Sequence, residues 1–127
     1  MYRVLVVDDE KLERDGIRFL LSMEEGEWEI YEAANGKLAL NELRKHPVDL
    51  MLTDIKMPHM DGLETAAALR KRGDNTCLIF ITSMAQYALK GYEVNAFDFL
   101  VKPLAYKLFC IKFEKALSHI DRSEAYY

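Results

Sequence analysis

The chain has 127 residues, of which 50% are hydrophobic and 30% charged, and its formal net charge is -4. This size and balance are typical of one globular domain with a single core. The acidic balance argues against nucleic-acid binding by this stretch alone, because phosphate contacts need a concentrated basic surface. No apolar segment reaches the roughly 20 residues that cross a bilayer. Since Met1-Tyr2-Arg3 also shows no signal-peptide pattern, we expect a cytoplasmic protein without membrane contact.

Strand and helix patterns alternate along the chain. Apolar β-rich runs predict five strands, at residues 2–7, 28–33, 49–53, 77–82 and 97–101. Apolar periodicity predicts five helices, around residues 17–21, 36–43, 63–67, 85–92 and 113–120. The expected core positions include Ala66 and Ala67 in the third helix and Ala85, Ala88, Leu89 and Tyr92 in the fourth. Short connections between such elements require parallel strands and right-handed crossovers, so the sequence predicts an α/β fold with helices on both faces of one sheet.

The two cysteines, Cys77 and Cys110, lie in apolar surroundings. They have no CxxC spacing and no neighbouring histidine cluster, which are the patterns of redox and zinc sites. We therefore expect two small buried hydrophobic residues, without a disulfide or a bound zinc ion.

Polar residues stand at the ends of four of the predicted strands. These are Asp8-Asp9, Asp54, Thr82-Ser83 and Lys102-Pro103. The carboxyl ends of parallel strands meet at one edge of the sheet, where open α/β sheets bind their ligands. Three clustered carboxylates repel one another unless a cation neutralises them. A hydroxyl and an ammonium group nearby then suggest a site for a divalent metal ion and a phosphoryl group.

These motifs, in this order and spacing, resemble the receiver domain of a two-component response regulator. The matching segments are Val6-Val7-Asp8-Asp9-Glu10, the stretch from Asp54 to Gly62, Thr82, and Val101-Lys102-Pro103. The resemblance covers residues 1–121 and leaves 122–127 as a tail or the start of a linker to an output domain. It implies a flavodoxin-like, doubly wound parallel sheet of five strands in the order 2-1-3-4-5, with five helices.

The resemblance also implies a chemistry. Asp54 corresponds to the carboxylate that attacks the phosphorus of a phosphohistidine on a sensor histidine kinase. The metal would be Mg²⁺ or Mn²⁺, bound by Asp8, Asp9, Asp54 and the backbone oxygen of Lys56, with Asp9 as the direct ligand and Asp8 acting through water. Such a domain is not an enzyme in the usual sense, because it catalyses only its own phosphorylation and a slow autodephosphorylation.

The resemblance assigns roles to four further positions. Lys102 would place its ammonium group on one phosphoryl oxygen, and Thr82 would donate its hydroxyl to another. Phe99 corresponds to the family's switching aromatic residue, although an isolated strand phenylalanine would usually belong to the core. Pro103 matches a position where the family has a cis peptide bond.

Lys56 and Met84 occupy positions that vary in the family and border the phosphoryl group. Neither side chain can accept a hydrogen bond from an attacking water molecule. We therefore expect slow loss of the phosphate, whereas the simpler interpretation of Lys56 is a solvated loop lysine.

Other interpretations stay open. Taken alone, an Asp pair is usually a helix cap and a Lys-Pro pair is usually a turn. An aspartate-nucleophile phosphatase would need an acid where Lys56 stands. A flavodoxin-type electron carrier would need a phosphate loop where Asp8-Asp9-Glu10 would instead repel the phosphate.

The output is the least determined feature. Residues 80–99 are similar to receivers that precede LytTR-type DNA-binding domains, and residues 1–21 also resemble receivers joined to AraC-type domains. A longer native protein would be a transcription regulator that contacts DNA through a C-terminal domain. A complete chain would be a stand-alone phosphorelay or motility regulator. The resemblance also implies a phosphorylation-dependent homodimer through the fourth helix, fifth strand and fifth helix. These elements carry the candidate contacts Lys90, Glu93, Asp98, Lys107 and Lys112.

Overall fold

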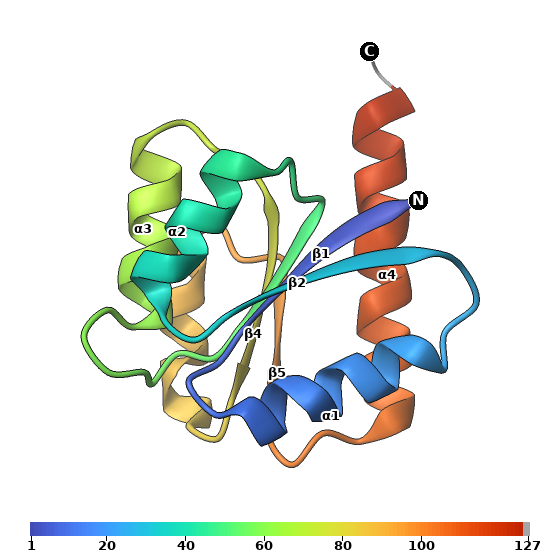
Figure 1. Cartoon of the computed structure of the whole chain (residues 1–127), viewed down its shortest axis with the longest axis horizontal. Coiled ribbons are helices and arrows are strands. Elements are labelled where there is room, and N and C mark those ends of the chain that lie inside the picture. Colours follow the sequence, from blue (N-terminus) through green and yellow to red (C-terminus); the bar gives the residue numbers. More distant parts are fainter. Residues whose placement is uncertain (126–127) are drawn as a thin grey trace.

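The structure is a computed structural model that describes residues 1–125. For residues 88, 92 and 123–125 it describes the backbone alone. It has one sheet of five parallel strands in the order β2-β1-β3-β4-β5 (Figure 1). The strands are β1 (Tyr2–Val7), β2 (Trp28–Ala33), β3 (Leu50–Thr53), β4 (Cys77–Thr82) and β5 (Asp98–Val101). The predicted strand order is confirmed, and each predicted strand lies within one residue of the observed one.

Five helical segments connect and follow these strands. They are α1 (Lys11–Ser22), α2 (Gly36–Lys45), α3 (Gly62–Lys71), the 3-10 helix η1 (Ala85–Val94) and α4 (Tyr106–Ala125). In Figure 1, α1 and α4 cover one face of the sheet, while α2, α3 and η1 cover the other. No helix within residues 1–125 is both long and apolar enough to cross a membrane.

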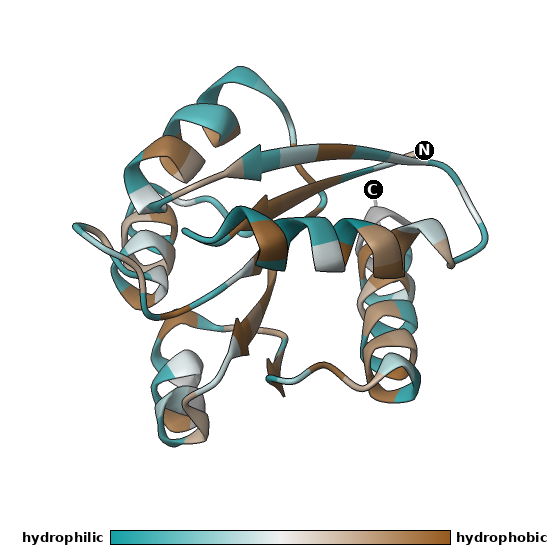
Figure 2. Ribbon diagram, turned by 60° about the horizontal axis from the view of Figure 1, so that its bottom comes forward, coloured by the Kyte–Doolittle hydropathy of each residue, from teal (hydrophilic) through white to brown (hydrophobic). Residues whose placement is uncertain are grey.

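Two apolar cores lie on the two faces of the sheet. Successive residues of β1 point to opposite faces, so Val4 and Val6 enter the core under α1 and α4, while Leu5 and Val7 enter the core under α2 and α3. All four side chains are fully buried. Figure 2 shows the central strands as largely hydrophobic. Strands buried on both faces are continuous apolar runs, which is why the sequence located them so closely.

The fourth helical segment differs from the prediction. It is a 3-10 helix, whose repeat of three residues per turn replaces the α-helical spacing that we assumed. Ala85 is exposed and Leu89 is 76% exposed, so the predicted stripe is wrong at these positions, and the side chains of Ala88 and Tyr92 lie outside the described part. Gly91 and Val94, three residues apart, are buried instead.

Two smaller expectations also need correction. In α3, Ala66 is buried but Ala67 is exposed, because the helix turns Gly62, Thr65, Ala66 and Leu69 toward the sheet. Cys77 and Cys110 are free thiols, as expected, but both are only partly buried. Cys77 is the first residue of β4, an inner strand of the sheet, and burial raises the pKa of its thiol to about 11.

Candidate functional site

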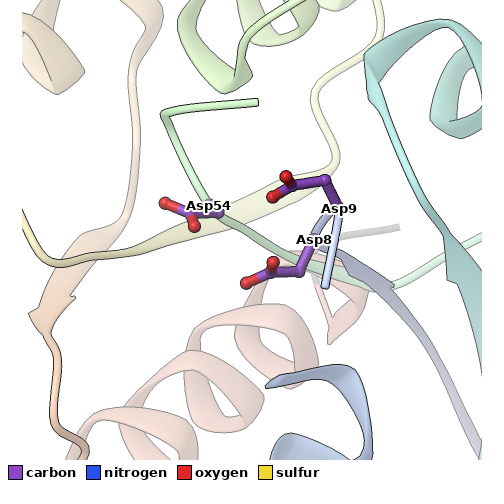
Figure 3. Close-up of side chains that lie close together, drawn as sticks. All are labelled: Asp8, Asp9 and Asp54. Carbon is purple, nitrogen blue, oxygen red and sulfur yellow. The ribbon is translucent and has the colours of Figure 1, made fainter. Parts of the chain in front are cut away.

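An acidic cluster stands at the carboxyl edge of the sheet, as the sequence predicted. Asp8 and Asp9 follow β1 and Asp54 follows β3, and these strands are neighbours with Val7 opposite Thr53. The three carboxylates offer oxygens that all lie within 4.8 Å of one another (Figure 3). Asp8 is buried, Asp54 is partly buried and Asp9 is exposed. A group of carboxylate oxygens fits the preference of Mg²⁺ for hard oxygen ligands.

Lys102 supplies the positive charge of this cluster. Its Nζ donates to Asp8 Oδ2 at 2.8 Å and to Asp54 Oδ2 at 3.0 Å. Its side chain is only 15% exposed. Burial alone would lower the pKa of Lys102, but the hydrogen bonds and charges of the two aspartates outweigh burial and raise the pKa. The ammonium group therefore stays charged. The Lys102-Pro103 peptide bond is cis, as the resemblance implied.

The orientation of the Asp54 carboxylate is fixed by the backbone, and its pKa is set mainly by burial. The amide of Ile55 donates to Asp54 Oδ1 at 2.7 Å, and the amide of Asp54 donates to the carbonyl of Val7 at 2.9 Å. Burial raises the pKa of Asp54 and outweighs the lowering effect of Lys102. A partly desolvated carboxylate that keeps one cationic partner is a suitable nucleophile for a phosphoryl group.

Gly62 fixes the backbone behind Asp54. Its amide donates to the carbonyl of Ile55 at 2.8 Å, and a Cβ atom at this position would overlap the backbone oxygen of Asp54. Asp61 precedes it as the N-cap of α3 and forms a capping box with Glu64. The sequence identified Asp61-Gly62 only as a loop signal, because the close approach of two backbones depends on the tertiary fold.

Thr82 and Phe99 lie near this edge on the next two strands. Thr82 ends β4 and is fully buried, and its hydroxyl oxygen accepts a hydrogen bond from the amide of Met84 at 3.1 Å. Phe99 in β5 is partly buried and packs against the core under α2 and α3. The ammonium of Lys112 lies 4.9 Å from the centre of its ring. Their roles as switch residues stay predictions.

Lys56 and Met84 lie in the loops that follow Asp54 and Thr82. Lys56 is exposed, and its Nζ lies 5.7 Å from the ring centre of Tyr87 in η1. Met84 is partly buried, and its carbonyl accepts a hydrogen bond from the amide of Tyr87 at 3.1 Å. Tyr87 thus joins the two loops. The sequence analysis missed this residue because its contact with Lys56 crosses between separate elements.

Two residues of α1 reach the cluster without having been predicted. Glu13 Oε2 lies 3.8 Å from Lys102 Nζ. Arg14 Nη1 donates to the backbone oxygen of Asp8 at 2.7 Å and its Nε donates to Glu32 at 3.0 Å. The available signal was weak: two arginines four residues apart on α1 and an acid near the end of β2.

Comparison with known proteins supports a single family. The family model described as response regulator receiver domain matches residues 4–112. The sensory transduction protein LytT of Bacillus subtilis (strain 168) is 40% identical over 103 residues, which cover 81% of this chain and 43% of that protein. The transcriptional regulatory protein BtsR of Salmonella typhi is 35% identical over 125 residues, or 98% of this chain and 50% of that protein. The chain thus spans no more than half of these relatives.

A solved structure agrees with the sequence match. The response regulator protein TrrA of Thermotoga maritima, in complex with Mg²⁺ and BeF, superimposes with a TM-score of 0.81 at 33% identity. The match covers 91% of this chain and 99% of that one. Together with the parallel sheet and its acidic cluster beside a lysine, these similarities show that the chain belongs to the receiver domains of two-component response regulators.

Proposed function

We propose that Asp54 of this receiver domain accepts a phosphoryl group from a phosphohistidine of a partner sensor histidine kinase. The observation that supports this most strongly is the contact of Lys102 with both Asp54 and Asp8 at the sheet edge. An Asp54 oxygen would attack the phosphorus, and the bond from phosphorus to the histidine nitrogen would break. The imidazole of the kinase would be the leaving group, and Asp54 would become an aspartyl phosphate. The domain would catalyse only its own phosphorylation and a slow autodephosphorylation.

Lys102 and Thr82 would stabilise the transferred group. The Lys102 ammonium would pair with a phosphoryl oxygen in place of the Asp54 oxygen that it contacts now. The Thr82 hydroxyl, which accepts from the amide of Met84, would turn to donate to another phosphoryl oxygen. That movement would open space for Phe99 to turn inward, and thereby carry the signal to β5.

The acidic cluster would hold Mg²⁺ or Mn²⁺. Asp9 and Asp54 would be direct carboxylate ligands, Lys56 would contribute its backbone oxygen, and the buried Asp8 would act through water. When bound, the ion would supply positive charge that lowers the repulsion between the cluster and the incoming phosphoryl oxygens. The residues present fit a divalent cation, because three neighbouring carboxylates offer oxygen ligands to it and their mutual repulsion would be neutralised by its charge.

The surface of η1, β5 and α4 would form a symmetric dimer after phosphorylation. Lys90, Glu93 and Lys107 are exposed on it. Asp98 and Lys112 are partly buried and form an ion pair with each other at 3.0 Å. They are therefore less available for contacts with a second subunit than the sequence led us to expect. Charges of both signs on one surface suit self-association about a two-fold axis.

The output would be transcription. The names of the relatives LytT and BtsR describe a sensory transduction protein and a transcriptional regulatory protein. We propose residues 1–121 as the receiver and residues 122–127 as the lead into an output domain, of LytTR type in preference to AraC type, that would contact DNA. A stand-alone phosphorelay or motility regulator is the alternative. The same proposal places the domain in the cytoplasm.

Sedimentation with a phosphoryl mimic tests the switch. Beryllofluoride with Mg²⁺ should move the chain from monomer toward dimer, and Thr82→Ala should weaken the shift. Thr76→Ala, a threonine at the opposite end of β4 whose hydroxyl bonds to Asp74, provides the matched control. An unchanged mass with a site shown to be occupied would mean that the domain does not signal through this dimer.

A further inference from the structure

We propose that Arg14 is a positioning residue for the metal site, acting through the backbone of Asp8. The inference rests on the proposed function, since it concerns the Mg²⁺ that the acidic cluster would bind. Arg14 is the fourth residue of α1, and its Nη1 donates to the backbone oxygen of Asp8 at 2.7 Å. It touches no cluster carboxylate in this arrangement. It holds the segment from which two of them project.

The side chain of Arg14 is held in place by Glu32 on β2. Its Nε donates to Glu32 Oε1 on β2 at 3.0 Å, and its side chain is only 15% exposed. Arg18, one turn further along α1, donates to the other oxygen of the same carboxylate at 3.0 Å. The guanidinium of Arg14 therefore joins the end of β1 to β2. Its planar set of N–H donors can serve both acceptors at once, which the single ammonium of a lysine cannot do in the same geometry.

The segment between β1 and α1 depends on contacts of this kind. Glu10 is the N-cap of α1 but makes no side-chain capping bond. The amide of Glu10 instead donates to Asp8 Oδ1 at 3.0 Å, and the amide of Asp8 donates to the carbonyl of Ala33 at 3.1 Å. Asp9 stands exposed between these two residues. The direction of its carboxylate thus follows from the backbone that Arg14 holds at Asp8.

Charge and position predict opposite effects when Arg14 is neutralised. A positive charge this close to the cluster repels a bound cation, so its removal would tighten Mg²⁺ binding if charge were its only influence. Loss of a group that orients metal ligands weakens binding, typically by about tenfold or more. The direction of the change therefore separates the two explanations.

Magnesium titration by calorimetry tests the proposal. Arg14→Met should weaken Mg²⁺ binding by about tenfold. Arg18→Met is the matched control: it removes the same charge from the same helix and the same Glu32 contact, and should leave binding within about twofold or tighten it. Wild-type or tighter binding in Arg14→Met would overturn the inference. If Arg14→Met does not fold, Arg14→Lys keeps the charge and should still bind more weakly, and wild-type affinity there would overturn it.

Hydrogen exchange in the metal-free protein tests the positioning role of Arg14 independently of Mg²⁺ binding. In Mg²⁺-free protein, the amide of Glu10 should exchange its hydrogen faster in Arg14→Met than in Arg18→Met, because its bond to Asp8 Oδ1 loses support. Equal exchange rates in the two variants would contradict the positioning role. A wild-type chain that binds no Mg²⁺ would overturn the proposed function as well, whereas normal wild-type binding with an unaffected Arg14→Met overturns this inference alone.

Discussion

The ammonium group of Lys102 lies 3.0 Å from the carboxylate of Asp54 while it also contacts Asp8 at 2.8 Å. One partly buried cation thus serves two carboxylates that follow different strands. A phosphoryl group on Asp54 would present new oxygens to the same ammonium group. The contact of Lys102 with Asp8 can persist during that exchange, so the lysine stays anchored while its second partner changes.

Gly62 should be intolerant of a side chain. Gly62→Ala would force the backbone of Asp54 to move, at a cost of about 1–3 kcal/mol of stability, which is typical of overpacking. Gly16→Ala is the control, because a Cβ there meets nothing within 4 Å and the residue lies inside α1. That variant should gain about 0.5–1 kcal/mol. Urea unfolding measures both, and a Gly62→Ala protein as stable as wild type would show that the backbones can separate freely.

Asp9→Ala should lose Mg²⁺ binding and phosphorylation but keep the fold. The substitution removes a proposed ligand and relieves repulsion within the cluster, so the metal-free protein should be as stable as wild type or more stable. Glu10→Ala removes a neighbouring exposed acid outside the cluster and should retain binding. Calorimetry with Mg²⁺ decides. If Asp9→Ala bound Mg²⁺ with wild-type affinity, the metal would have to lie elsewhere.

The phosphorylated state should last minutes or longer. Lys56 offers only donors to a water molecule, and Met84 offers an apolar side chain. Lys56→Asn combined with Met84→Glu should speed dephosphorylation by roughly tenfold, which corresponds to about 1.4 kcal/mol of better water positioning. Lys71→Asn with Met23→Glu makes the same exchanges at exposed positions away from the site. Phosphate loss after removal of the donor gives the rates. A wild-type lifetime of seconds, or a double variant no faster than wild type, would refute this role.

Cys77 should make stability fall in alkaline solution. Burial raises its pKa from 9.0 to about 11, so between these values the native thiol keeps a proton that the unfolded chain releases. The contribution of this thiol to stability is therefore complete below pH 9 and is lost as the pH rises through 11. Thermal unfolding should show a smaller loss over this window in Cys77→Ala. An identical pH dependence in both proteins would mean that the thiol is not protected.

Alkylation provides an independent measure of the same protection. At pH 9 the unfolded thiol would be about half ionised while the native thiol stays mostly protonated, so native Cys77 should react more slowly than the unfolded one. Mass analysis of peptides after brief iodoacetamide treatment, with urea-unfolded protein as the control, gives both rates.

The strands and the placement of the aspartates beside Lys102 were predictable because they leave local patterns. Doubly buried strands such as β1 and β4 are continuous apolar runs, and Asp8, Asp54 and Lys102 stand directly after such runs. Strand order then brought them together. Local pattern and global fold agree at these positions, which is the condition under which a sequence can be interpreted without a structure.

Contacts through the backbone and the geometry of η1 were not predictable. Arg14 donates to a backbone carbonyl oxygen, which every residue has, and Gly62 allows close packing because it has no side chain. Neither contact leaves a recognisable motif in the sequence. In η1, Ala85 and Leu89 fit an α-helical spacing that the 3-10 backbone does not adopt. The packing of Tyr87 against Lys56 from another loop likewise depends on the tertiary fold.

Phosphorylation of Asp54 is the central claim, and intact mass tests it most directly. Purified protein treated with acetyl phosphate and Mg²⁺ should gain one phosphoryl group, and Asp54→Asn should gain none. Asp15→Asn, a partly buried acid in α1 that pairs with Lys11, should be labelled like wild type. Labelling that survives Asp54→Asn unchanged, or a wild-type protein that gains no mass while Mg²⁺ is bound, would contradict the account.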